Sequence, residues 1–169
     1  MLSISRKRSI LLLVASVVFV LDRLTKAGIM RKLAAFETVP VIPNFFDIVH
    51  VRNKGAAFGI LAMADSSFRM PVLLLSTAVA IGLLLYFIKI VREQDTLTLV
   101  ALALIIGGAI GNLYDRIFYG HVVDFIDWYV GVHHWPAFNI ADSGITVGVI
   151  LLGVELILRG RGLGPDQGA

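Results

Sequence analysis

The sequence predicts an all-α membrane protein in which four transmembrane helices form a single domain. Of its 169 residues, 57% are hydrophobic, whereas soluble domains have about 45–50%. The apolar residues are gathered in four long stretches, and basic residues flank these stretches rather than forming a patch. The net charge of +3 therefore indicates membrane flanks and not a nucleic-acid partner. The absence of cysteine excludes disulfides, thiolate metal sites and a cysteine nucleophile.

Each apolar stretch is near the length of about 20 residues that a helix needs to cross a membrane. The first begins near Ser9 and runs uncharged to Leu21. Basic residues precede it, as in a signal peptide, but no cleavage site before a soluble domain follows, so we expect a retained helix. The other three stretches are Val72–Ile88, Thr96–Tyr114 and Asp142–Leu158.

Four spans place both termini on the same side of the membrane. Slightly more Lys and Arg lie on that side, which favours cytoplasmic termini. In the first outer segment, 31–70, the stretch Val39–Val51 is rich in Val, Ile and Phe and contains proline turn signals. It predicts a small extracytoplasmic β-sheet, or β-cradle, between the first and second spans. We expect residues 1–159 to form the domain and the glycine-rich tail 160–169 to be disordered.

Several charged residues lie at the ends of the spans, where a charge near lipid is costly unless it is paired. Asp22 and Lys26 are four residues apart on one helix face and can pair. Asn112, Asp115 and Arg116 cluster at the end of the third span. Asp115 and Arg116 are adjacent and point about 100° apart, so each is expected to pair with another group. For these charged residues we favour ion pairs that close the outer end of the bundle. An alternative role for Arg116 is to balance the charge of Asp115 or of a nearby substrate carbonyl.

Asp124 and Asp142 differ from these residues because no Lys or Arg lies between Arg116 and Arg159. Two carboxylates in a half-buried region without bases cannot both ionise cheaply. This is the requirement for an aspartic peptidase pair, in which one carboxylate accepts a proton from water and the other, protonated, polarises the scissile carbonyl. The residues alone leave other roles open: Asp142 as a helix N-cap and Asp124 as a solvated loop residue.

Other functions have weaker support in the sequence. The histidines His121, His133 and His134 lack the spacing of an HExxH metal motif, so we expect no metal, and no other cofactor motif is present. A proton-coupled carrier would also use carboxylates within the membrane, but carriers often have internal repeats and mid-membrane sites, which are not evident here. A non-catalytic membrane scaffold is the third alternative.

Five motifs follow one another along the chain. They are Asp22-Arg-Leu-Thr-Lys26, Arg52-Asn-Lys-Gly-Ala-Ala-Phe-Gly59, Gly111-Asn-Leu-Tyr-Asp-Arg116, Val122-Val-Asp-Phe-Ile-Asp127 and Phe138-Asn-Ile-Ala-Asp142. Each motif alone is weak, but all five in this order on a four-span chain are highly specific. By these motifs the chain resembles the lipoprotein signal peptidase (signal peptidase II) family over nearly its whole length.

The resemblance implies an aspartyl endopeptidase of the bacterial inner membrane with its active site near the extracytoplasmic face. It implies that prolipoproteins carrying a diacylglyceryl cysteine are cut just before that cysteine, that globomycin inhibits at the same site, and that Asp124 and Asp142 are catalytic. We expect a monomer in contact with membrane lipids, and a mobile flap at 53–59. Residues implied in substrate positioning and site architecture are Asp22, Lys26, Asn53, Gly55, Asn112, Asp115, Arg116 and Asn139.

Overall fold

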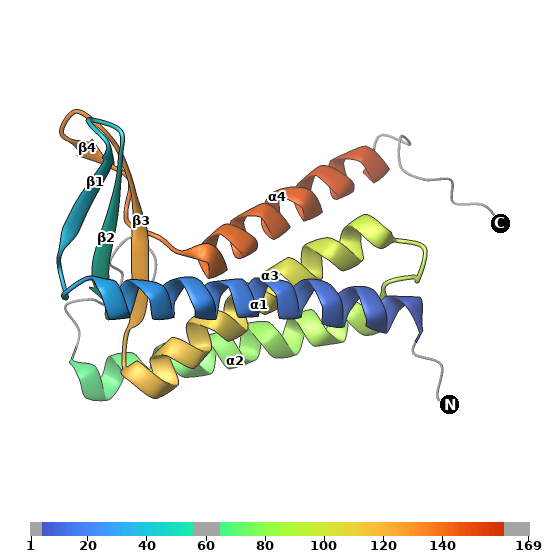
Figure 1. The fold of residues 1–169 in the computed structure, drawn as a ribbon. Coiled ribbons are helices and arrows are strands. Elements are labelled where there is room, and N and C mark those ends of the chain that lie inside the picture. Colours follow the sequence, from blue (N-terminus) through green and yellow to red (C-terminus); the bar gives the residue numbers. More distant parts are fainter. Residues whose placement is uncertain (1–4, 56–64, 161–169) are drawn as a thin grey trace.

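The computed structural model describes residues 5–55 and 65–160, which form four long helices and a four-stranded antiparallel sheet at one end of them (Figure 1). The helices are α1 (Arg6–Lys32), α2 (Ser66–Ile90), α3 (Thr96–Tyr119) and α4 (Ile140–Gly160). The strands, which lie in the order β1-β2-β3-β4, are β1 (Thr38–Ile42), β2 (Phe46–Asn53), β3 (Val122–Val130) and β4 (His133–His134).

Three of the helices in the described part of the chain, α2, α3 and α4, are long and apolar enough to cross a membrane. The prediction of a membrane protein is therefore confirmed for these three spans. The helix α1 is longer still but carries Asp22, Arg23 and Lys26 along its length, and its crossing stays a prediction. Because α4 includes Gly160, the helical part extends one residue beyond the expected domain end, and residues 161–169 lie outside the described residues.

The helix α3 is the centre of the bundle and contacts α1, α2 and α4. Glycines allow this close packing, because a Cβ atom at Gly107 would lie 2.7 Å from the Ala15 carbonyl oxygen and one at Gly148 would lie 2.6 Å from that of Ala101. Small residues let transmembrane backbones approach in this way, since lipid provides no hydrophobic force between helices. Gly107 and Gly111 have the GxxxG spacing that is typical of close helix packing, and Gly107 lies against α1 in this way.

The sheet is larger than the sequence predicted. The strands β1 and β2 coincide with the expected hairpin between the first two spans, but β3 and β4 come from the segment between α3 and α4. A fold class with a β-cradle only between the first and second helices is therefore incomplete. An isolated two-stranded hairpin is marginally stable in water, and β3 supplies the third strand, with Asp124 opposite Val51 and Val122 opposite Asn53.

A glycine in the left-handed backbone conformation connects α3 to the strand β3, which carries Asp124. Gly120, which follows α3, has a φ angle of 72° and donates its N–H to the Arg116 carbonyl. Glycine adopts this conformation without the steric cost that a Cβ atom brings. The chain then turns into β3, and this turn brings Asp124 next to the end of α3.

Close packing of α3 on α4 gives the first prediction. A Cβ atom at Gly108 would overlap the backbone carbonyl oxygen of Ala141, which directly precedes Asp142. Gly108→Ala should lower the free energy of unfolding by about 1–3 kcal/mol through overpacking. The control is Gly153→Ala, since nothing lies within 4 Å of a Cβ atom there. Thermal unfolding in detergent measures both variants, and equal melting temperatures would contradict the packing.

Candidate active site

A single asparagine joins the two aspartates that the sequence singled out. Asp124 lies on β3 and Asp142 in the first turn of α4. The side-chain amide of Asn139 donates from Nδ2 to Asp124 Oδ1 at 2.7 Å, and its Oδ1 accepts from the Asp142 N–H at 2.9 Å. The Asn139 N–H in turn donates to Asp142 Oδ2 at 3.3 Å. The structure therefore brings both carboxyl groups to the same asparagine.

This arrangement corrects the two alternative roles of the aspartates. Asn139 is the N-cap of α4, and Asp142, three residues later, accepts from the cap's own N–H, as in a capping box. Asp142 is thus the third residue of α4 and not the N-cap. Asp124 is only 2% exposed and lies within a strand, so it is not a solvated loop residue.

Side-chain amides hold the remaining carboxylate oxygens. Asn53 Nδ2 on β2 donates to Asp124 Oδ2 at 3.0 Å, and Asn112 Nδ2 on α3 donates to Asp142 Oδ1 at 2.7 Å. Within residues 5–55 and 65–160, neither carboxylate forms an ion pair. Neutral amides can therefore orient both groups without fixing their charge.

Burial also changes the acidity of the strand aspartate. The pKa of Asp124 is raised from 3.8 to about 7, first because the carboxyl group is buried and second because the negative charge of Asp142 lies nearby. Hydrogen bonds from Asn53 and Asn139 act in the opposite direction because they stabilise the charged form. Near neutral pH the pair can hold one proton, which belongs to both groups when they titrate together.

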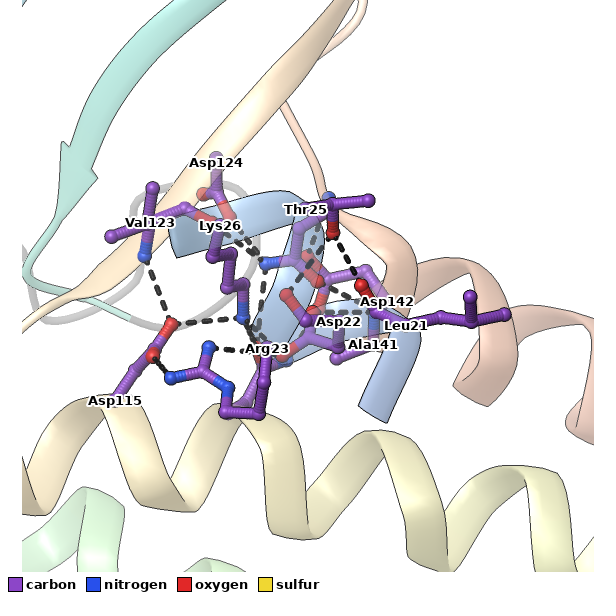
Figure 2. A network of polar contacts seen from close by, with 12 residues as sticks. Leu21, Asp22, Arg23, Thr25, Lys26, Asp115, Val123, Asp124, Ala141 and Asp142 are labelled. Carbon is purple, nitrogen blue, oxygen red and sulfur yellow. Dashed lines mark hydrogen bonds and ion pairs between the residues drawn. The ribbon is translucent and has the colours of Figure 1, made fainter. Parts of the chain in front are cut away.

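Beneath the aspartates, four charged side chains of α1 and α3 form a buried network (Figure 2). Lys26 Nζ lies 2.9 Å from Asp22 Oδ2 and 2.8 Å from Asp115 Oδ2, and all three side chains are fully buried. Arg23 Nη1 lies 2.6 Å from Asp115 Oδ1, and its Nη2 lies 3.1 Å from Asp22 Oδ2. Two positive and two negative charges are thus balanced, and the expected pairing of Asp22 with Lys26 is present.

The network also holds the backbone next to each aspartate. Asp115 Oδ2 accepts from the Val123 N–H at 3.2 Å, and Asp22 Oδ1 accepts from the Ala141 N–H at 3.0 Å (Figure 2). Val123 directly precedes Asp124 and Ala141 directly precedes Asp142, so each network carboxylate fixes the approach to one of the pair. Asp22 and Asp115 therefore form ion pairs and also accept hydrogen bonds from the backbone beside Asp142 and Asp124.

Arg23 is the site residue that the sequence reasoning missed. Its guanidinium contacts both network carboxylates and stacks 4.7 Å from the centroid of the Tyr114 ring. The one available signal was its position inside the Asp22-Arg-Leu-Thr-Lys26 motif. Helical spacing gave no reason to select it, because adjacent residues on a helix point in different directions.

Arg116 supports the segment after β2 rather than Asp115. Its Nη2 donates to the Gly55 carbonyl and its Nη1 to the Asn112 carbonyl, both at 3.4 Å. The Gly55 N–H donates to Asn53 Oδ1 at 2.9 Å, so the amide that contacts Asp124 is itself oriented. Most of the proposed flap at 53–59 lies outside the described residues, which resume at 65.

Histidines near the sheet have other partners. His134 Nδ1 lies 2.9 Å from Asp127 Oδ2, and its ring stacks on Tyr129 with centroids 4.5 Å apart. His121 lines a different cavity, together with His50 and Arg52. In the part of the chain that the structure describes, no group of three or more His, Cys, Asp or Glu residues is placed to hold a metal ion.

Apolar helices that carry two buried, amide-supported carboxyl groups at one end define a membrane peptidase of the aspartic class. The family model described as Signal peptidase (SPase) II matches residues 14–158. The chain therefore belongs to the signal peptidase II family.

Individual relatives agree with this assignment. A protein named lipoprotein signal peptidase from Syntrophotalea carbinolica is 52% identical over 143 residues, which cover 85% of this chain and 88% of the relative. One of the same name from Paraburkholderia phymatum is 47% identical over 149 residues, 88% of each chain. A bacterial membrane enzyme solved in meso at 2.3 Å superimposes with a TM-score of 0.81 at 34% identity, covering 94% of each chain. A second, solved at 1.9 Å, has a TM-score of 0.77 at 35% identity, covering 86% of this chain and 91% of the other.

The buried network gives the second prediction. Lys26→Met removes the cation that lies between Asp22 and Asp115 and leaves two buried carboxylates with Arg23 alone. Breaking a buried ion pair on one side costs about 3–5 kcal/mol, so the variant should unfold at a clearly lower temperature. Lys32→Met, at the exposed end of α1, is the matched control. A Lys26→Met protein as stable as the control would contradict the role of the network.

Proposed function

We propose that this chain is a membrane aspartyl endopeptidase that removes the signal peptide from diacylglyceryl-modified prolipoproteins, cutting just before the lipidated cysteine. The observation that carries the proposal is that Asn139 hydrogen-bonds to both Asp124 and Asp142. Two acidic groups that form no ion pair within the described residues therefore share one support. Relatives named lipoprotein signal peptidase support the substrate class. Nothing in the relatives favours the carrier alternative.

In the proposed mechanism the pair of aspartates shares one proton. The ionised carboxylate accepts a proton from a water molecule, whose oxygen attacks the scissile carbonyl carbon. The protonated carboxyl group donates to the carbonyl oxygen and stabilises the tetrahedral intermediate. The carbon–nitrogen bond then breaks as a proton is transferred to the leaving amine. A pKa of about 7 for Asp124 is what allows the pair to hold this proton at neutral pH.

We also propose that α1 is the fourth span and that both termini are cytoplasmic. Its buried Asp22 and Lys26 face the bundle, whereas Leu13 and Leu24 are 67% and 65% exposed. A helix with its charges turned inward and its apolar face turned outward is compatible with lipid. The start of α1 and the end of α4 lie at the end opposite the sheet (Figure 1), which supports an active site near the extracytoplasmic face.

The proposed partners follow from the same site. Both aspartates and all of their amide contacts come from one chain, which supports a monomeric enzyme. The lipidated cysteine would stay at the membrane surface with its acyl chains among the membrane lipids, next to the sheet end of the helices. Globomycin is proposed to bind at the two aspartates, in competition with the precursor.

The third prediction tests the aspartate pair. Asp124→Asn and Asp142→Asn should each reduce cleavage of a lipidated precursor by at least about 10³-fold, because each variant lacks one partner of the acid–base pair. Asp127→Asn is the control, since Asp127 lies on the same strand but pairs with His134. The measurement is release of the signal peptide from a purified precursor in detergent. Normal cleavage by either of the first two variants would show that the assignment is wrong.

The fourth prediction concerns pH. Asp124 is protonated below about pH 7 and loses its proton above it, so kcat/KM should fall as the pH rises through 7. The hydrogen bond from Asn53 stabilises the charged form of Asp124 and lowers its pKa. Asn53→Ala removes this bond and should therefore raise the pKa of Asp124. The alkaline limb of the variant should therefore move to higher pH, even if its maximal rate is lower. If the alkaline limb of the variant stays at the same pH or moves to lower pH, Asp124 is not the group that loses the proton.

A further inference from the structure

A cavity lies on the face of the sheet that points away from the aspartates. It has a volume of about 240 Å³ and is lined by Met30, His50, Arg52, Tyr119 and His121. Neighbouring residues of a strand point to opposite faces. Because Asn53 reaches Asp124, the side chain of Arg52 is directed to the other face. The cavity is therefore separate from the proposed catalytic pair.

Basic groups meet in this cavity without a counter-charge. The described residues that line it include no carboxylate. Asp115 acts on His121 electrostatically, but its carboxylate is already paired with Arg23 and Lys26. The side chain of Arg52 has no ion pair or hydrogen bond to any residue that the structure describes. The local charge is positive and unbalanced.

His50 adds a buried group with an unused nitrogen. Its side chain is 4% exposed, and Nδ1 lies 3.0 Å from the Leu33 carbonyl oxygen, to which it donates. The other nitrogen, Nε2, is buried and has no hydrogen-bond partner in residues 5–55 and 65–160. A buried polar atom without a partner is uncommon in native proteins. When the ring is protonated, Nε2 becomes a donor that an anion would satisfy.

The electrostatics of His121 agree with a missing anion. Burial lowers the pKa of His121, and the positive charges of Arg52 and His50 lower it further. The basic groups around His121 therefore disfavour its charged form. A bound anion would reverse the effect, because it stabilises all of the positive charges together.

We propose that this cavity binds the phosphate group of an anionic membrane-lipid headgroup. Arg52 provides the permanent cation, and a guanidinium matches phosphate through paired N–H donors. Tyr119 is the last residue of the spanning helix α3, and tyrosine is enriched where a membrane meets water. The cavity thus has a cation for a phosphate group and lies at the level where the membrane meets water.

Histidine NMR of the full chain in detergent tests the proposal. The chain has four histidines, and His133 and His134 on β4 serve as internal references. Inorganic phosphate, added at constant ionic strength, should shift the ring signals of His50 and His121 in a saturable way and raise the pKa of His121. The shifts should be larger at pH 6 than at pH 8, because the protonated rings are the donors.

Variants and lipids separate the possible sources of the signal. Arg52→Gln should weaken phosphate binding about tenfold or more, in line with the loss of a charged hydrogen bond. Arg92→Gln, an exposed arginine in the loop between α2 and α3, is the matched control and should bind like the unchanged protein. In nanodiscs without added phosphate, phosphatidylglycerol should reproduce the bound-state signals and phosphatidylcholine should not.

Each possible result either supports or contradicts the proposed lipid-headgroup site. Unchanged His50 and His121 signals with phosphate, or equal binding by Arg52→Gln and Arg92→Gln, would overturn the site. A response to inorganic phosphate with unbound signals in both nanodiscs would overturn the lipid assignment in favour of a soluble phosphate compound. Bound-state signals in both nanodiscs would overturn the preference for an anionic lipid. The inactive Asp142→Asn protein should respond like the unchanged protein, so the outcome does not depend on the proposed peptidase activity.

Discussion

The buried network of Asp22, Arg23, Lys26 and Asp115 is the interaction on which the site depends. Charges removed from water cost several kcal/mol each unless partners surround them, and here every charge has two opposite neighbours. The carboxylate oxygens also accept from the backbone at the residues preceding the two proposed catalytic aspartates. One network therefore holds both β3 and the first turn of α4.

Two kinds of aspartate result from two kinds of neighbour. Those of the network form ion pairs with Lys26 and Arg23, so that positive and negative charges are balanced. Asp124 and Asp142 face the amides of Asn53, Asn112 and Asn139, which can donate or accept and carry no charge. An acid–base pair must change its protonation state during each turnover, so amides are suitable supports where cations would not be.

Local spacing predicted part of this site and could not predict the rest. The pairing of Asp22 with Lys26 follows from helical periodicity, and the hairpin of β1 and β2 from its β-branched residues and prolines. The contact of Lys26 with Asp115 joins residues far apart in the chain, and no local pattern indicates it. The strand β3 was not predicted, and a solvated loop position was one alternative for Asp124. The pairing that makes the segment a strand is with β2, which lies far away in the chain. Its partner β2 and the end of α3 together make the buried environment that accepts the carboxyl group.

The packing of the helices therefore also determines the geometry of the site. A Cβ atom at Gly111 would lie 2.8 Å from Asp22 Oδ2 and 3.3 Å from the Ala141 side chain. The absence of a side chain thus leaves the space in which Asp22 reaches the Ala141 N–H. A larger residue at this position would displace that carboxylate, and the first turn of α4 would lose the hydrogen bond that places Asp142. Since the lipid supplies no force that could hold α4 in place, small residues on α3 and the charges beside them must set the separation of the two aspartates.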